Sequence, residues 1–297
     1  MFVVTYRKLF YALSAILMVG SVVALSVWGL NFGIDFKGGA IIEVDYVDAR
    51  PETAVVKEAL APLSLGEYSV RTTGEKGFII RTKAITPAEK TAIIDTLSKG
   101  GVKITESRFD SIGPLLGAEA AKKAMTSIAL VIFCIVLYIT FAFRAVSEPV
   151  SSWKYGLVAV FALLHDVLVP TGVFAVLGHF NGVEVDTLFV TALLVILGFS
   201  IHDTIVVFDR VRENLRLAHR EEFATTVGNS INQTFSRSIN TSLTVLIALL
   251  VLYFVGGAST QHFTLALLVG IVAGTYSSIF LGSPLLVTLE KFQNKSK

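Results

Sequence analysis

The chain has 297 residues, of which 53% are hydrophobic and only 16% are charged, and its 25 Lys and Arg nearly balance its 23 Asp and Glu. A soluble domain carries roughly a quarter charged residues, so this composition argues against a soluble protein. No basic cluster indicates a nucleic-acid partner. The one cysteine, Cys134, lies in an apolar stretch, which excludes a disulfide within the chain.

Six apolar stretches are long enough to cross a bilayer, which takes about 20 residues each. They are Leu9–Leu30, Met125–Phe143, Tyr155–Leu177, Val185–Phe208, Ile239–Val255 with an N-terminal extension, and Phe263–Leu289. The first stretch has an alternative interpretation as a signal peptide, because Ala24-Leu25-Ser26 resembles a cleavage site. Its apolar part is longer than that of a typical signal peptide, which favours an uncleaved anchor.

Lys and Arg are concentrated in alternate connections between the spans, which predicts the topology. The connections that would lie on one side of the membrane contain Arg7, Lys8, Arg144, Lys154, Arg210, Arg212, Arg216, Arg220, Lys291, Lys295 and Lys297. The loops His179–Glu184 and Gly256–His262 contain neither residue type. We therefore expect both termini in the cytoplasm and residues 31–124 outside, where 13 basic and 13 acidic residues cancel.

The outside segment alternates strand and helix patterns. Strands are predicted at Ala40–Val47, Tyr68–Thr73, Gly77–Thr82 and Val102–Phe109, and helices at Pro51–Ala61 and after Thr86. The second helix is the better marked, with Thr86 as N-cap, Pro87 at the first position and Glu89 completing a capping box. Gly100 and Gly101 end it. The order βαββαβ predicts an α+β ferredoxin-like domain.

No metal or catalytic cluster appears in this domain, so we expect it to bind or move rather than to catalyse. Residues 111–123 then lead into the second span, either as an amphipathic segment at the membrane surface or as an ordinary linker. The predicted division is a cytoplasmic N-terminus with the first span, the outside domain, a juxtamembrane linker, a five-helix bundle and a cytoplasmic tail, at residues 1–30, 31–111, 112–124, 125–289 and 290–297.

Three charged residues fall at membrane depth: Asp166 in the third span, Asp203 in the fourth and Arg237 at the start of the fifth. A charge at the centre of a spanning helix costs about 2.5–3.5 kcal/mol on insertion scales and usually faces a partner or a water-filled path. We therefore expect Asp203 to pair with Arg237 across the bundle. Such a pair is either a titratable switch that takes up and releases a proton, or an ion pair that only fixes helix packing.

A polar stripe surrounds Arg237 on the fifth span. Its members share one helix face by their spacing, and they are Gln233, Arg237, Asn240, Thr241 and Thr244. Lipid cannot satisfy their hydrogen bonds, so the stripe must face protein or water.

Each intramembrane aspartate follows a histidine, as His165-Asp166 and His202-Asp203. Adjacent helical residues point about 100° apart, so neither dipeptide forms a ligand pair by itself. A metal site shared by facing helices is the weaker interpretation, and we expect no metal and no cofactor. Asp166 is expected to support a helix contact or the proton path, and His202 to be a relay or a packed neutral imidazole.

Three strings together resemble the SecF family of bacterial protein-export subunits. They are Gly33-Ile34-Asp35-Phe36-Lys37-Gly38-Gly39 after the first span, GFSIHDTIVVFDRVREN at 198–214, and QTFSRSINTSLT at 233–244. The glycine string is shared with the sister family SecD, whereas the middle string is long and specific. The resemblance extends over the whole chain, as one span, an outside domain and five further spans.

This resemblance implies a subunit of the bacterial cytoplasmic membrane, similar to half of a proton-driven RND transporter. SecF pairs with SecD and assists the SecYEG channel in exporting unfolded preproteins with the proton-motive force. Matched to the family motifs, the acid required for proton flow falls on Asp203 and the required arginine on Arg237. Gly33, Asp35, Gly38 and Gly39 match the segment that joins the first span to the outside domain.

The chain departs from the family pattern at Phe199 and His202, where Tyr and Asn are usual. An imidazole beside the key carboxylate puts the pH range of activity in doubt, but not the assignment of Asp203. Two competing functions remain. A passive scaffold of the translocon uses the same residues for packing. An intramembrane hydrolase finds no support, because the chain lacks HExxH, GxSxG and GxGD strings.

Overall fold

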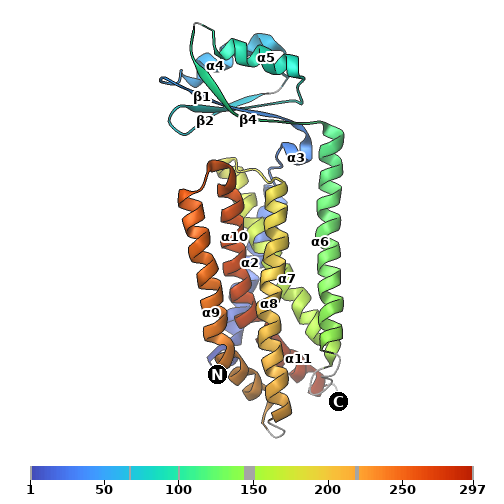
Figure 1. Ribbon diagram of the computed structural model, residues 1–297. Helices are drawn as coiled ribbons and strands as arrows, with labels where there is room; N and C mark the ends of the chain where they lie inside the picture. Colours follow the sequence, from blue (N-terminus) through green and yellow to red (C-terminus); the bar gives the residue numbers. More distant parts are fainter. Residues whose placement is uncertain (1, 67, 100, 144–150, 218–220, 296–297) are drawn as a thin grey trace. The chain divides into compact units, whose positions relative to one another are not determined.

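The computed structural model describes residues 2–66, 68–99, 101–143, 151–217 and 221–295 (Figure 1). Gly100, Arg144, Arg220 and Lys297, which entered the sequence argument, lie outside these ranges. Contacts divide the chain into two compact units, residues 1–31 with 125–297, and residues 32–124.

The first unit is a helical bundle, and six helices of the described chain are long and apolar enough to span a membrane, as predicted. A short helix, α1 (Phe2–Thr5), precedes them. The spans are α2 (Arg7–Val27), α6 (Pro114–Ala142), α7 (Ser152–Asn181), α8 (Thr187–Leu217), α9 (Phe223–Val255) and a composite of α10 (Ala258–Tyr276), η2 (Ser277–Gly282) and α11 (Ser283–Lys295). Helix α8 runs nine residues past the predicted end at Phe208, because the helix continues through its charged segment.

The sixth span contains a π-helical turn at Ser277–Gly282 that the sequence argument did not foresee. Pro284 lies two residues after it, and proline has no N–H to donate to the carbonyl one turn earlier, at Phe280. The hydroxyl of Ser283 donates to the carbonyl of Ser278 at 3.1 Å and so satisfies one backbone group in the irregular turn. The span is thus one long helix with a local break in its hydrogen-bond pattern.

The half of the bundle in which α6 ends has an apolar core. Phe143, at the end of α6, stacks on Tyr155 of α7 with ring centroids 5.4 Å apart, and both rings meet Phe208 of α8 edge to face. Ile139 of α6 and Leu163 of α7 are buried in the same cluster. These contacts fix the end of α6 against α7 and α8.

The second unit is an α+β domain with the predicted βαββαβ order. Its elements are a short helix α3 (Ile34–Lys37), then β1 (Gly39–Tyr46), α4 (Thr53–Leu60), η1 (Ala61–Leu63), β2 (Ser69–Thr73), β3 (Gly77–Thr82), α5 (Pro87–Leu97) and β4 (Ile104–Ile112). The sheet is antiparallel in the order β2-β3-β1-β4, which confirms the ferredoxin-like topology. Strand β4 continues to Ile112, opposite Gly39, three residues beyond the predicted end.

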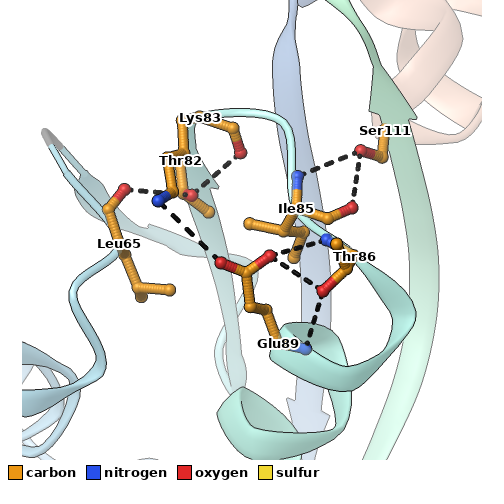
Figure 2. Close-up of polar contacts among 7 residues, drawn as sticks. All are labelled: Leu65, Thr82, Lys83, Ile85, Thr86, Glu89 and Ser111. Atoms are coloured by element: carbon orange, nitrogen blue, oxygen red, sulfur yellow. Dashed lines mark hydrogen bonds and ion pairs between the residues drawn. The ribbon is translucent and has the colours of Figure 1, made fainter.

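The capping box of α5 forms as predicted (Figure 2). The backbone N–H of Glu89 donates to Thr86 Oγ1 at 3.3 Å, and the backbone N–H of Thr86 donates to Glu89 Oε2 at 2.7 Å. Both bonds satisfy groups that a helix N-terminus otherwise leaves unpaired. Lys83 Nζ lies 3.8 Å from the same carboxylate.

Helix α6 replaces the separate linker expected between residues 112 and 124. It begins at Pro114, two residues after β4 ends, and continues without a break to Ala142. Proline suits the first turn of a helix, because its fixed φ is helical and its missing N–H has no intrahelical role there. The Gly113-Pro114 break ends the strand, as expected, but it starts the spanning helix directly.

Candidate functional site: two polar centres in the membrane

Asp203 lies on the buried face of α8 with 3% of its surface exposed. Its Oδ2 atom is buried and has no hydrogen-bond partner among the described residues. Ser238 and Ser242 of α9 lie beside the carboxyl group, and Arg237 is close enough to act on it electrostatically. The carboxyl group therefore sits where α8 packs on α9, as its depth in the sequence suggested.

The expected direct ion pair between Asp203 and Arg237 is wrong for this structure. Among the described residues, the two side chains have no N–O approach within 4 Å, and Arg237 is exposed on the outer side of α9. The cause is helical periodicity. Ser238, the next residue, points inward to Asp203, and Arg237 is rotated away from that contact by about 100°.

Helix α9 carries two polar faces rather than one. The predicted stripe of Gln233, Arg237, Asn240, Thr241 and Thr244 is exposed throughout. A second row, spaced four residues apart, is buried against the bundle and consists of Thr226, Ser230, Thr234, Ser238 and Ser242. This row was not predicted, although small hydroxyl residues recur at every fourth position of the sequence.

The exposed stripe is held mainly by local bonds. Gln233 Oε1 accepts from Arg210 Nε at 2.7 Å and from Asn214 Nδ2 at 2.9 Å, which ties α9 to the end of α8. Thr241 and Thr244 each donate to a carbonyl one turn earlier in α9. The outward surface around Arg237 therefore presents hydrogen-bonding groups in a helix that is otherwise apolar.

His202 is also exposed, so it points away from the contact that buries Asp203. The Asp203 and His202 side chains lie on different sides of α8, as their adjacent positions require. Phe199, the other departure from the family pattern, is half-buried.

Asp166 forms a second polar centre, and it is fully buried with 0% exposure. Its Oδ1 lies 2.9 Å from His165 Nδ1, and its Oδ2 accepts a bond from Ser277 Oγ at 2.9 Å. Ser200 of α8 donates to the same Oδ2. Asp166 thus joins α7, α8 and the π turn. The sequence suggested a role for Asp166 in helix contact, but it did not identify Ser200 and Ser277 as its partners.

A chain of hydroxyl groups lies around this second centre. Ser278 Oγ donates to the carbonyl of Ser200 at 3.2 Å and lies 2.9 Å from Thr204 Oγ1. Ser242 of the buried row on α9 lies 2.6 Å from Thr275 Oγ1 on α10. Single serines and threonines in apolar spans carry little signal by themselves, so only the structure identifies these partners.

The glycine string after the first span forms a tight turn into the sheet. Gly38 has φ 77° and ψ 163°, a backbone conformation that is nearly exclusive to glycine. A Cβ atom at Gly38 would lie 2.7 Å from Pro114 Cα, and one at Gly117 would lie 2.8 Å from Gly38 N. Gly117 was not foreseen. Gly33 is the N-cap of α3, Asp35 lies in its first turn, and Gly39 begins β1.

No group of three His, Cys, Asp or Glu side chains in the described chain is arranged to hold a metal ion. The two centres therefore offer carboxyl, imidazole, guanidinium and hydroxyl groups only. Groups of these types can form hydrogen bonds, and the ionisable ones can exchange protons.

Comparison with known proteins agrees with this architecture. The family model described as "Protein export membrane protein SecD/SecF, C-terminal" matches residues 92–292, and the "SecD/SecF GG Motif" matches residues 23–49. A SecF protein translocase subunit of Thermobaculum terrenum is 43% identical over 97% of this chain and 93% of its own length. One of Anaerolinea thermophila is 38% identical over 96% of this chain and 92% of its own length.

The fold is similar to that of a solved export protein. The crystal structure of SecDF, a translocon-associated membrane protein from Thermus thermophilus, matches with a TM-score of 0.83 and 31% identity. The match covers 97% of this chain but only 38% of the longer SecDF chain. On these sequence and fold matches, the chain belongs to the SecD/SecF family of protein-export membrane proteins, within which it is a SecF translocase subunit.

Proposed function

We propose that this subunit pairs with SecD, assists SecYEG in exporting unfolded preproteins, and couples that work to proton flow through Asp203 and Arg237. A SecF subunit is a multi-pass transport protein of the Sec export machinery and not an enzyme. The proton coupling, the named partners and the orientation are the parts that we propose. The observation that carries the coupling is a buried carboxyl group with an unpaired oxygen at membrane depth.

The energetic cost of a buried charge is what links Asp203 to Arg237. A carboxylate buried without a contacting cation is strongly penalised, and an approaching cation offsets that penalty. Arg237 acts on Asp203 from outside contact distance. A change in the α8–α9 packing that brings the guanidinium closer stabilises the carboxylate, and its withdrawal favours the protonated acid. The protonation of Asp203 is then linked to the position of α9.

The exposed stripe on α9 is where we place the SecD partner. Polar side chains on a spanning helix need protein or water partners, because lipid offers none. Gln233, Asn240 and Thr244 are exposed in this single chain. A second transmembrane subunit that covers them would also control how far Arg237 can move toward Asp203.

The Lys and Arg distribution supports an orientation with both termini in the cytoplasm of a bacterial cell and the α+β domain on the extracytoplasmic side. The domain offers no described catalytic cluster, so its proposed role is to bind or move the preprotein. The Gly33–Gly39 segment is the proposed hinge, since Gly38 and Gly39 have positive φ values.

A passive scaffold is the competing function, and proton conduction separates the two. The measurement is proton flux into vesicles that contain this chain, its SecD partner, SecYEG and a translocating preprotein. Asp203→Asn keeps the shape and hydrogen-bonding capacity but cannot exchange a proton, so flux and gradient-stimulated export should be abolished. Asp203→Glu keeps the carboxyl group and should retain part of both. Arg237→Lys keeps the cation but not its planar fork, and should be impaired less than Arg237→Met.

The matched control is Asp209→Asn, the same change six residues along α8, at an exposed carboxylate that pairs with Arg212 at 2.6 Å. It should leave proton flux unchanged. A scaffold predicts that every variant loses export only in proportion to its loss of assembled complex. An Asp203→Asn complex that assembles fully and conducts protons normally would end the coupling proposal.

A further inference from the structure

His165 and Asp166 form a second buried ionisable pair that the coupling proposed above does not use. Both side chains have 0% exposure. The carboxyl group receives hydrogen bonds from three elements: His165 Nδ1 on α7, Ser200 on α8 and Ser277 on the π turn. These three contacts hold the carboxyl group where α7, α8 and the π turn meet.

A negative charge on the Asp166 carboxyl group needs a compensating positive charge inside the membrane. Within the described chain, His165 is the only basic group in contact with Asp166, since its Nδ1 forms the sole ion-pair contact of this carboxyl group. The other ring nitrogen, Nε2, is buried and finds no hydrogen-bond partner in the part of the chain that the structure describes. A proton bound at Nε2 turns the pair into imidazolium and carboxylate with no net charge. Its loss leaves a buried negative charge without compensation, which is costly in low dielectric.

The neighbouring elements supply few other titratable groups. On α8, Asp203 lies three residues from Ser200, on the same buried face. On α10, the ring of Tyr276 lies 6.1 Å from the His165 ring. On α2, the hydroxyl of Tyr11 is turned to Thr288 at 2.9 Å. The described lysines and arginines of these helices lie near the helix ends, as Arg7, Lys8, Lys154, Arg210, Arg212 and Arg216.

Three irregularities of the helices meet at this pair. Pro170 follows Asp166 by one turn, and it has no N–H for the Asp166 carbonyl. The π turn contributes Ser277 and Ser278. Gly274 lets α8 come close, since a Cβ there would lie 2.9 Å from Ser200 Cβ. π turns often occur at functional sites, and interrupted helices surround ion sites in transporters.

A path of hydrogen bonds leads from Asp166 to the residue next to Asp203 on α8. Ser200, which donates to Asp166, has its carbonyl bonded by Ser278, and Ser278 shares a hydrogen bond with Thr204. Thr204 is the residue after Asp203 on α8. A rearrangement that changes one centre therefore acts on helix contacts shared with the other.

We propose that His165 and Asp166 are a second proton-binding site, which takes one proton from water at Nε2 and returns it to water when the π turn rearranges. No covalent bond of the protein other than this N–H forms or breaks. The role of the site in transport rests on the proposed proton coupling, whereas proton binding itself does not. A neutral imidazole that only packs against Asp166 is the competing account.

The direct test is ¹⁵N NMR of histidine side chains in the full chain with its SecD partner in lipid. The chain has five histidines, so His165→Gln identifies the signal. We expect the His165 ring to be doubly protonated at low pH and to lose one proton as pH rises, with Nε2 as the nitrogen that loses it. A ring that keeps one protonation state at every pH overturns the proposal.

Two variants sharpen the result. Asp166→Asn removes the balancing charge, so the doubly protonated signal of His165 should be lost at pH values where the unmodified chain shows it. His179→Gln, a histidine of the same helix that stacks on Trp28, should leave the His165 signal unchanged. Persistence of the doubly protonated ring in folded Asp166→Asn contradicts the pairing. If that variant does not fold, the titration of the unmodified chain still decides.

The same measurement on Asp203→Asn separates this proposal from the proton coupling. The His165 titration should persist there even though proton flux is lost. Normal flux in Asp203→Asn together with a titrating His165 would refute the coupling and keep the second site. Lost flux together with a His165 ring that keeps one protonation state would keep the coupling and refute the second site.

Discussion

The two compact units of the chain both bury apolar side chains, but they differ in the polar side chains that they bury. In the described part of the α+β domain, Thr82 is the only buried polar residue, and the core consists of residues such as Ile42, Phe78 and Ile93. The bundle buries Asp166 and Asp203 along with many serines and threonines. Its large apolar residues are often exposed instead, as at Leu9, Phe141 and Phe254.

The difference follows from the solvent that surrounds each unit. In water, apolar burial drives the domain to fold. In lipid, apolar helices gain little by touching each other, so association depends on packing and on hydrogen bonds between helices. The interior of the domain therefore consists almost entirely of apolar side chains, whereas the interior of the bundle also holds carboxyl, imidazole and hydroxyl groups. Three measurements can break or sharpen this comparison.

The largest effect is expected in the domain core. Phe78 is fully buried and meets Tyr46 edge to face at 5.9 Å. Phe78→Ala should lower the free energy of unfolding by about 3–5 kcal/mol. Residues 31–113 expressed alone should be soluble and unfold cooperatively in urea. Urea unfolding of this segment therefore measures the change in the free energy of unfolding. Val55→Ala, at an exposed position of α4, should change the free energy of unfolding by about 0.5 kcal/mol or less. A random-coil circular dichroism spectrum of the unsubstituted segment would refute an independent core.

A smaller effect is expected at the capping box of α5. Thr86→Ala should cost about 0.5–2 kcal/mol at neutral pH, by loss of the bond to the Glu89 N–H. The hydrogen bond from the Thr86 backbone, then that from its side chain and the nearby Lys83, lower the pKa of Glu89. A lowered folded pKa gives stability that is complete above the unfolded pKa and is lost as pH falls through the folded value.

Urea unfolding of the isolated domain over a pH series checks this sign. The stability difference between the unsubstituted domain and Glu89→Gln should shrink as pH falls. Glu75→Gln, which removes the same charge at an exposed turn position, controls for net charge. A difference that grows toward acid pH would contradict the proposed cause.

The smallest effect is expected for a single bond inside the bundle. Ser242 and Thr275 share a buried hydrogen bond of 2.6 Å between α9 and α10. Hydrogen bonds between membrane helices average about 0.6 kcal/mol, so a double-mutant cycle with Ser242→Ala and Thr275→Val should give a coupling energy of that size. Thr244→Ala, on the exposed face, is the control. A coupling as large as the Phe78 loss would remove the contrast between the units.

The α+β domain was largely predictable because its signals are local. The Thr86 cap, the Gly74–Gly77 turn and the strand patterns each act within a few residues, and together they specify βαββαβ. The true end of β4 at Ile112 was not predictable, since it depends on pairing with Gly39 across the sheet. The six spans were predictable from length and hydropathy. The continuous start of α6 was missed, because Gly113-Pro114 can either end a structure or begin one.

The site was predictable in its residues but not in its contacts. The rarity of charge at membrane depth identified Asp166, Asp203 and Arg237 without a structure. The sequence could not place Arg237 on the outer side of α9, because both faces of that helix are polar. The partners of Asp166 come from α8 and the π turn, and their pairing depends on helix packing that no spacing rule encodes.

The two polar faces of α9 have a consequence for the biogenesis of the subunit. Between Phe223 and Thr244 two sides of this helix are polar, because one row of hydroxyls faces the bundle and the other stripe is exposed. A newly inserted copy without a partner exposes Arg237 and its neighbours to hydrocarbon, at an energetic cost that only another protein or water relieves. We therefore expect the proposed pairing to stabilise the subunit in the bilayer, and we expect an excess of unpaired copies to offer membrane quality control a recognisable defect.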